Sequence, residues 1–427
     1  MDRRRHAPWL IAACLALFAV LALPWPGTAS GESPAEAGGE APQARADAAP
    51  PAAPGSPAVA PEEMAGLGEM EFDSEAERYV ATLGGGRAVL TIVPSLQAQL
   101  TRVLSDHRVP WGATVLIEPR TGRVLAMAEY ARRPGEARGL ALRAVAPAAS
   151  VFKIVTSAAL LERGVEPESE ICYHGGKHRI APGNLADDPR RDRRCMTLAS
   201  ALGHSANVVF AKLADRGLSA DLLRTEAGRF LFNAPIPFAR PVEVSRAEIP
   251  EDPFALATTA AGFGPVRLSP LHGALLAAIV ANGGVFVPPE IVERVDGAEM
   301  PARPAAHRAV DERVAGALAA MMRTTVTQGT ARKLFRDRRS GSALRDVAVA
   351  GKTGSLAERN PYRDYSWFVG FAPADNPQVA VATVVANETL WRVKAPYVAR
   401  EALRAYFADQ AGRTQAALQR GTRTAAR

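Results

Sequence analysis

Lysine is scarce in this chain of 427 residues, in which arginine supplies nearly all of the 51 basic side chains. An arginine side chain does not lose its proton near neutral pH, whereas a desolvated lysine can act as a base. The few lysines are therefore the positions at which proton-transfer chemistry is to be sought. They are Lys153, Lys177, Lys212, Lys333, Lys352 and Lys394.

Long apolar runs are also missing, apart from residues 9–23. This run follows three arginines at residues 3–5 and precedes Pro24 and a small-residue stretch, which is typical of a signal peptide cleaved after Ala29. The run is shorter than the ~20 residues of a standard spanning helix, yet an uncleaved anchor is about equally favoured. We expect residues 1–29 to be a signal peptide or membrane anchor. Either places the body in the cell envelope, at the outer face of the cytoplasmic membrane or in the periplasm.

Large apolar side chains are nearly absent from residues 30–66, where Ala, Pro, Gly and Glu dominate. Such a stretch cannot bury enough surface to offset its chain entropy, so it is predicted to be a disordered tether. A lead-in segment at residues 67–87, a domain at residues 88–410 and a basic tail at residues 411–427 are expected to follow. A tether suits a body that must reach a substrate at a distance from the membrane.

Cysteine occurs only three times. Cys14 lies in the apolar leader, where too little apolar sequence precedes it for a lipoprotein cleavage site. Cys172 and Cys195 could bind zinc together with His174 and His178, but two glycines between the histidines argue against a helical ligand pair. In an oxidising compartment a Cys172–Cys195 disulfide is favoured over a metal site, and free thiols are the remaining alternative.

Strand patterns occur at both ends of the domain, with helical patterns between them. A Pro-Arg-Thr-Gly turn joins two early runs into a predicted hairpin, and three more runs come late in the chain. Buried helices are predicted at residues 151–163 and between Ser269-Pro270 and Asn282-Gly283. The composite is an α/β domain with one sheet and an inserted helical region. The expected strands are residues 113–118, 123–128, 346–351, 366–371 and 378–386.

The most suggestive local pattern is Ser150-Val151-Phe152-Lys153. Residues three apart share a face of a helix, so the lysine amine should lie beside the serine hydroxyl. Burial would lower the lysine pKa, and the neutral amine could then take the serine proton. The first turn of the helix would direct backbone N–H groups toward a developing oxyanion. Alone, such a pattern more often marks a capped, buried helix.

Two further polar patterns follow. Ser205-Ala206-Asn207 lies between helical runs at residues 197–202 and 208–217, in what should be a short exposed turn. Its serine and asparagine could hydrogen-bond a catalytic lysine and a substrate amide, although alone it would be read as a helix connection. Residues 352–355, Lys-Thr-Gly-Ser, are expected to follow directly on a strand. A small-residue strand edge accommodates an extended peptide, and the lysine adds positive potential.

Together the patterns form the ordered set S-x-x-K, S-x-N, K-T-G, which is typical of β-lactamases and penicillin-binding proteins. From about residue 88 to 407 the sequence resembles the penicillin-binding transpeptidase family, in a monofunctional form without a glycosyltransferase domain. One departure is Val93, where the family commonly carries an acid. Supporting segments are residues 91–97, 117–127, 262–264, 268–271 and 367–373.

The resemblance implies a β-lactamase/transpeptidase-like fold, an antiparallel sheet flanked by helices with an inserted, mainly helical subdomain. It implies that Ser150 is the nucleophile and Lys153 its base. Ser205 would relay a proton to the leaving amine, and Asn207 would hold the substrate backbone. Lys352 would complete the catalytic set.

The same resemblance implies how the substrate is held. Thr353 and Ser355, with Gly354 between them, would bind the terminal carboxylate of a D-Ala-D-Ala stem peptide, or that of a β-lactam that mimics it. Backbone N–H groups of Ser150 and Ser355 would form the oxyanion hole. The implied reaction is peptidoglycan crosslinking through an acyl-serine, with no cofactor and no metal.

Several alternatives stay open. A D,D-carboxypeptidase differs only in that water resolves the acyl-enzyme. A serine β-lactamase would need a deacylating base, and no residue pattern marks one. A non-catalytic penicillin sensor would be acylated without turnover. A different hydrolase is disfavoured because residues 203–207 lack the last glycine of G-x-S-x-G. The formal charge of +7 suits membrane or wall polymer, and no motif supports nucleic acid. A glycan-polymerising partner is expected to be a separate protein.

Overall fold

The computed structural model describes residues 66–300, 302–336 and 344–425. The predicted leader or anchor at residues 1–29 and nearly all of the predicted tether lie outside this part of the chain. Within it, no helix has the length and apolar character needed to cross a membrane.

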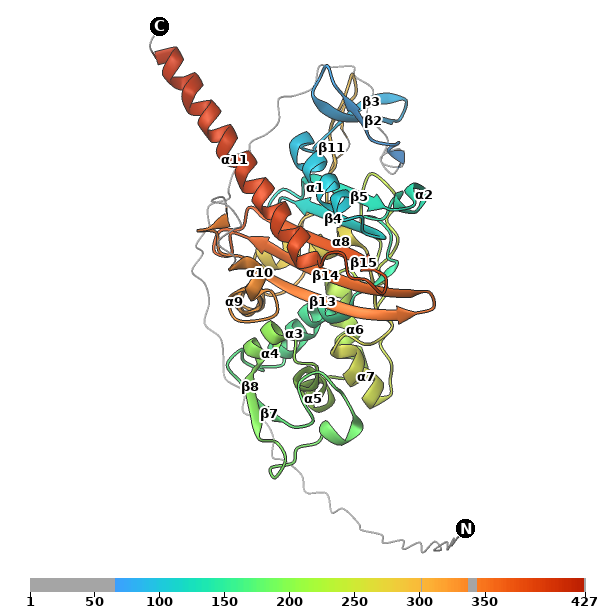
Figure 1. Cartoon of the computed structure of the whole chain (residues 1–427), viewed down its shortest axis with the longest axis vertical. Coiled ribbons are helices and arrows are strands. Elements are labelled where there is room, and N and C mark those ends of the chain that lie inside the picture. The colour runs from blue at the N-terminus through green and yellow to red at the C-terminus, as the bar shows by residue number, and fades with distance from the viewer. Residues whose placement is uncertain (1–65, 301, 337–343, 426–427) are drawn as a thin grey trace, which may run out of the picture. The chain divides into compact units, whose positions relative to one another are not determined.

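A five-stranded antiparallel sheet organises the domain (Figure 1). Its order is β13-β14-β15-β4-β5, so the early hairpin lies beside the last strand, with Trp111 opposite Ala386. The prediction of one sheet made from early and late segments is confirmed. The strands are β4 (Trp111–Ile117), β5 (Val124–Ala131), β13 (Ala350–Arg359), β14 (Tyr362–Ala372) and β15 (Val379–Asn387).

The expected strand at residues 346–351 is wrong in its position. The strand begins only at Ala350, so the Lys-Thr-Gly-Ser pattern lies within β13 and does not follow a strand. The register pairs Ala350 with Phe371, and β14 ends one residue later, at Ala372. Pro373 comes next and has no N–H to donate, so the regular ladder stops there, and beyond it the Ala374 N–H donates back, to the Ala348 carbonyl at 2.8 Å.

Alternating side chains of this sheet enter two separate cores, as expected of a sheet covered on both faces. Val115 and Trp367 contribute to one core, whereas Leu116 and Phe368 contribute to the other. The helix α8 (Pro270–Ala281) packs on the first face, and α1 (Pro94–Asp106) and α11 (Ala395–Ala425) on the second. Figure 1 shows the sheet between these helices.

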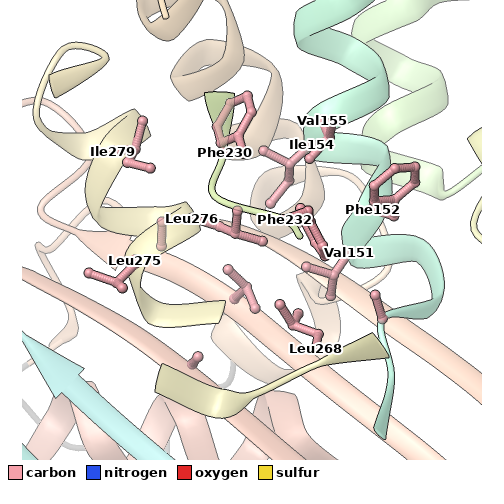
Figure 2. Packing of buried hydrophobic residues seen from close by; sticks show 14 of the residues in the cluster. Val151, Phe152, Ile154, Val155, Phe230, Phe232, Leu268, Leu275, Leu276 and Ile279 are labelled. Atoms are coloured by element: carbon pink, nitrogen blue, oxygen red, sulfur yellow. The ribbon is translucent and has the colours of Figure 1, made fainter. Parts of the chain in front are cut away.

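The helix α8 is buried from Pro270 to Val280, and its predicted start and stop are confirmed. The Ser269 hydroxyl caps it by accepting from the backbone N–H of His272, 3.2 Å away. Leu275, Leu276 and Ile279 belong to the same core as the segment that carries Ser150, the 3₁₀ turn η2 (Ala149–Phe152) and α3 (Lys153–Glu162) (Figure 2). The Phe152 and Phe232 rings meet edge to face there, with centroids 5.5 Å apart.

The inserted region between β5 and β13 is mainly helical, as predicted. It holds the hairpin β7–β8, in which Cys172 lies opposite Cys195, and a short hairpin-like pair β6–β9 beside the Ser150 segment. Its elements are α2 (Pro134–Ala137), β6 (Ala146–Pro147), β7 (Glu170–Tyr173), η3 (Pro182–Asn184), β8 (Arg194–Thr197), α4 (Leu198–His204), α5 (Asn207–Gly217), α6 (Ala220–Arg229), α7 (Pro253–Ala260), β9 (Arg267–Leu268), α9 (Glu312–Thr327) and α10 (Arg332–Phe335).

A second antiparallel sheet is built from the lead-in segment. Its order is β1-β2-β3-β11, so residues near the start of the described chain pair with a strand of the middle region. The strands are β1 (Glu71–Asp73), β2 (Arg78–Leu83), β3 (Gly86–Leu90) and β11 (Val292–Val295), and a small pair, β10 (Val285–Phe286) with β12 (His307–Arg308), lies apart from this sheet.

Candidate active site

Ser150 lies on the 3₁₀ turn η2, directly before α3, rather than inside a regular α-helix. In a 3₁₀ turn the side chains of residues three apart eclipse one another, which stacks Ser150 and Lys153. The residue before the nucleophile, Ala149, has a left-handed φ of 49°. Such a conformation costs an alanine energy and occurs where the surroundings impose it, as at many functional sites.

Lys153 is fully buried, with 0% of its surface exposed. Its Nζ lies 2.8 Å from Ser150 Oγ and donates to Asn207 Oδ1 at 2.9 Å and to the Ala261 carbonyl at 2.5 Å. In a neutral amine the two remaining N–H groups serve these two acceptors, which directs the lone pair at the serine hydroxyl. Burial, reinforced by the positive charge of Lys352, lowers the pKa of Lys153 well below its ordinary value.

Ser205 and Asn207 are held by the connection between α4 and α5. Ser205 ends α4 in a left-handed conformation with φ 54°, and Asn207 begins α5. The expectation of an exposed turn is wrong for Asn207, which is only 6% exposed. It is covered because its Nδ2 donates to the His178 carbonyl at 2.8 Å while its Oδ1 accepts from Lys153.

Lys352 connects the second pattern to the third. From β13 its Nζ donates to Ser205 Oγ at 2.9 Å and to the Thr353 carbonyl at 2.7 Å, and the side chain is 0% exposed. Burial lowers the pKa of Lys352 to about 7. Hydrogen bonds thus join the five predicted catalytic residues into two groups, Ser150 with Lys153 and Asn207, and Ser205 with Lys352. The charge of Lys352 acts on Lys153 across the two groups.

The predicted substrate-binding residues lie on β13, an edge strand of the sheet. Gly354 lets this strand pack against the nucleophile turn, since a Cβ there would sit 3.2 Å from Val151 Cγ2 and 3.3 Å from the Ala148 carbonyl oxygen. Thr353 Oγ1 lies 2.6 Å from Thr330 Oγ1. Ser355 lies on the same strand, and its side chain is exposed.

Gly262 closes the site from a third direction. Its φ is +92°, and a Cβ would lie 2.5 Å from the Ala149 carbonyl oxygen and 2.9 Å from the Ser150 nitrogen. No larger residue can take this conformation and this close approach together. The preceding carbonyl, that of Ala261, is the one that accepts from Lys153.

Cys172 and Cys195 form a disulfide, which confirms that alternative from the sequence. It uses both sulfur atoms that the zinc hypothesis required. His174 instead contacts Asp192 Oδ1 at 2.5 Å through its Nδ1. The same Asp192 accepts from the fully buried Lys212 at 2.8 Å. We call residues 172–195 the disulfide-closed loop.

The penicillin-binding protein transpeptidase domain model matches residues 112–406, which is most of the chain and covers every residue of the site above. The chain belongs to the penicillin-binding protein transpeptidase family. The fold expectation drawn from the sequence is confirmed by this match.

Similar proteins of this family are found in several bacteria. The peptidoglycan D,D-transpeptidase PbpA of Mycobacterium tuberculosis is 30% identical over 316 residues, which cover 65% of this chain and 62% of that protein. Its structure as an imipenem acyl-enzyme complex has a TM-score of 0.63 and 26% identity over 75% of this chain and 80% of that one. A D,D-transpeptidase domain from Eggerthella lenta shares the fold, with a TM-score of 0.62 and 24% identity. The match covers 80% of this chain and 95% of that one.

Sequence reasoning did not identify three contributors to the site. Thr330 has no motif around it, and it reaches Thr353 because its backbone N–H donates to the Gly203 carbonyl at 3.1 Å, which ties the end of α9 to α4. The carbonyls of Ala261 and His178 act through the backbone, so no side-chain pattern marks them. Gly262, which directly follows Ala261, was a usable sequence signal for the Ala261 carbonyl.

Proposed function

We propose that this chain is a penicillin-binding D,D-transpeptidase that forms peptidoglycan peptide crosslinks through an acyl-serine on Ser150. One observation carries the proposal. Lys153 is fully buried beside Ser150 Oγ, and its partners are a hydroxyl, an amide and a carbonyl rather than a carboxylate. Burial without a counter-ion favours the neutral form of this lysine, which can take the proton of the serine.

In the proposed acylation, each proton that one group loses is taken up by another group. Ser150 Oγ attacks the carbonyl carbon between the two D-alanines while Lys153 Nζ takes its proton. Backbone N–H groups of Ser150 and Ser355 stabilise the oxyanion. The C–N bond breaks, and the leaving D-alanine amine takes a proton from Ser205, which is resupplied by Lys352 at 2.9 Å.

Substrate binding uses the edge of β13. An extended stem peptide adds to this edge as a further strand, and its terminal carboxylate binds Thr353 and Ser355. Lys352 contributes positive potential to that carboxylate. Asn207 uses one N–H for His178 and keeps its second N–H for a substrate carbonyl.

The second half-reaction transfers the acyl group to an amine of a neighbouring stem peptide. Among the described residues, none of the hydrogen bonds made by the side chains of Ser150, Lys153, Ser205 and Lys352 goes to a carboxylate. A carboxylate base is what a fast hydrolase would use to activate water. This counts against a serine β-lactamase, and the reaction products distinguish an amine acceptor from water.

Mass spectrometry of products from a pentapeptide donor, with and without an acceptor amine, tests the reaction type. We expect a crosslinked dimer when the acceptor is present. Tetrapeptide as the sole product under both conditions would assign the chain as a D,D-carboxypeptidase. A labelled acyl-enzyme with no peptide product would assign it as a sensor.

The nucleophile has its own test. Replacing Ser150 by alanine should abolish labelling by a fluorescent penicillin, because it removes the hydroxyl that lies 2.8 Å from Lys153 Nζ and becomes the nucleophile. Retained labelling in the folded variant would contradict the whole assignment.

Location and partners complete the proposal. We place the domain outside the cytoplasm, at the outer face of the membrane or in the periplasm, and the Cys172–Cys195 disulfide supports an oxidising compartment. Stem peptides and β-lactams are the ligands, residues 1–29 provide the membrane contact, and a separate polymerase supplies the glycan. Co-purification from crosslinked membranes tests that last partner, and recovery without any polymerase would contradict it.

A further inference from the structure

Lys177, His178 and His204 are anchored beside the proposed catalytic lysine. The proposed mechanism does not use the nitrogen atoms of their side chains. The Lys177 carbonyl accepts from the Val208 backbone N–H at 3.3 Å, and the His178 carbonyl accepts from Asn207 Nδ2 at 2.8 Å. Both residues are thus attached to the start of α5. His204 directly precedes Ser205 at the end of α4.

The electrostatic surroundings of these side chains are cationic. Burial lowers the pKa of His178, and the charge of Lys177 lowers it further. Burial followed by the charge of Lys177 lowers the pKa of His204. Both imidazoles are therefore neutral near pH 7 and each can donate one N–H, while Lys177 supplies a full positive charge.

No carboxylate neutralises this group. In the described part of the chain, the side chains of Lys177, His178 and His204 form no ion pair and no hydrogen bond, and no acidic residue acts on either imidazole pKa. The three acids of the same loop are engaged elsewhere, because Asp187 and Asp192 pair with Lys212 and Asp188 pairs with Arg191. A cation with two N–H donors and no partner is an arrangement that binds an anion.

The disulfide-closed loop holds this group in place before any ligand arrives. The Cys172–Cys195 bond closes the base of the loop, and the Lys212–Asp192–His174 contacts fix its interior. Asn184 ties the segment after His178 by accepting from the Ala181 N–H at 3.0 Å. A preorganised site loses less side-chain freedom when it binds a ligand.

We propose that Lys177, His178 and His204 form a second anion subsite, which binds a free carboxylate on the donor stem peptide upstream of its D-Ala-D-Ala end. The inference rests on the proposed transpeptidase function. The terminal carboxylate is bound by Thr353 and Ser355 on β13, and the peptide continues past Ser150 toward Asn207, beside which His178 lies. The enzyme therefore prefers donors whose internal carboxylate is free over donors in which it is amidated.

Two pentapeptide donors that differ only in that carboxylate, free or amidated, test the subsite with the full-length protein. The acylation kcat/KM of the wild type should favour the free form by about two- to fivefold, the range for one partly exposed charge pair. In Lys177→Gln the ratio should fall to about one. Lys333→Gln is the matched control, because Lys333 is an exposed lysine on α10, and it should keep the wild-type ratio.

A second measurement needs no variant. Raising the ionic strength should reduce the wild-type ratio toward one, because salt screens a partly exposed pair. An equal ratio in wild type and folded Lys177→Gln, or a ratio insensitive to salt, overturns the subsite alone. A wild type that labels with penicillin but acylates neither peptide overturns the proposed function and the subsite with it.

Discussion

Lys153 and Lys352 at the active site and Lys212 under the disulfide-closed loop are all 0% exposed, but their partners differ in kind. Lys212 donates to Asp192 at 2.8 Å and pairs with Asp187 at 3.1 Å. Lys153 and Lys352 have only hydroxyl, amide and carbonyl partners. The first lysine holds a loop together, whereas the other two have the surroundings that the proposed proton transfers require.

The difference shows that burial alone does not produce a base. Burial removes hydration from any ammonium group, but a carboxylate within hydrogen-bond distance restores the stability of the charged form. At Lys153 a neighbouring positive charge does the opposite. The absence of a counter-ion, more than the lysine itself, distinguishes the catalytic positions.

Replacing Lys153 by arginine should have the largest effect on Ser150 acylation. The guanidinium stays protonated, so it keeps the charge but cannot accept the serine proton. We expect the acylation rate to fall by about 10²- to 10⁴-fold, the contribution of a general base. Stopped-flow measurements with a chromogenic penicillin check this, with Lys333→Arg as the exposed control. An unchanged rate would show that Lys153 is not the base.

The pH dependence of acylation should reveal Lys352 next. Its pKa is about 7, so above that pH it loses the proton that it supplies through Ser205 and the charge that attracts the substrate carboxylate. We expect the rate to decline above about pH 7, by up to about tenfold per unit. Lys352→Arg stays charged but cannot give up a proton to Ser205, so it should lower the rate and remove the decline. A wild-type rate that still rises through pH 9 contradicts this role.

The lowered pKa of Lys352 also makes the free energy of unfolding depend on pH. The pKa of Lys352 is lowered from 10.5 in its ordinary state to about 7 in the folded protein. Between those pH values the unfolded chain binds more protons than the folded one, so the free energy of unfolding increases with pH. Below pH 7 the penalty for burying this lysine is complete. Denaturant titrations at pH 7 and pH 9 would measure the difference.

How far the sequence predicts these features depends on whether their causes are local. The limits of α8 follow from Ser269-Pro270 and Asn282-Gly283, and Ser150 and Lys153 meet because a helical turn brings residues three apart together. These signals lie within a few neighbouring residues. The α/β fold and the contact between Ser150 and Lys153 were therefore predictable.

The remaining features are set by distant segments. The start of β13 depends on where β14 ends at Pro373, and the burial of Asn207 depends on the carbonyl of His178 in another loop. Thr330 reaches Thr353 only because α9 ends against Gly203. No pattern around these residues records such contacts, because tertiary packing decides them.

The variant Lys212→Met tests whether this buried lysine contributes to stability or to acylation. Removing one partner of a buried pair leaves Asp192 uncompensated, which should lower the free energy of unfolding by about 3–5 kcal/mol. Acylation per folded molecule should change little, since Lys212 contacts no residue that bonds Ser150. Lys212→Met with Asp192→Asn should recover part of the loss, because it removes the stranded charge. A large loss of acylation in the folded single variant would assign Lys212 to the catalytic set.

The disulfide gives the smallest expected change in acylation. Replacing Cys172 and Cys195 by alanine opens a loop whose ends are 23 residues apart in sequence, and loop entropy puts the cost at about 3.4 kcal/mol. Lys212 and Asp192 still hold the loop, so the His178 carbonyl should stay on Asn207 and acylation at low temperature should fall only a few-fold. Combining this pair with Lys212→Met removes both restraints. If the combined variant, kept folded, still acylates at the wild-type rate, the loop is not needed to position Asn207 and Lys153.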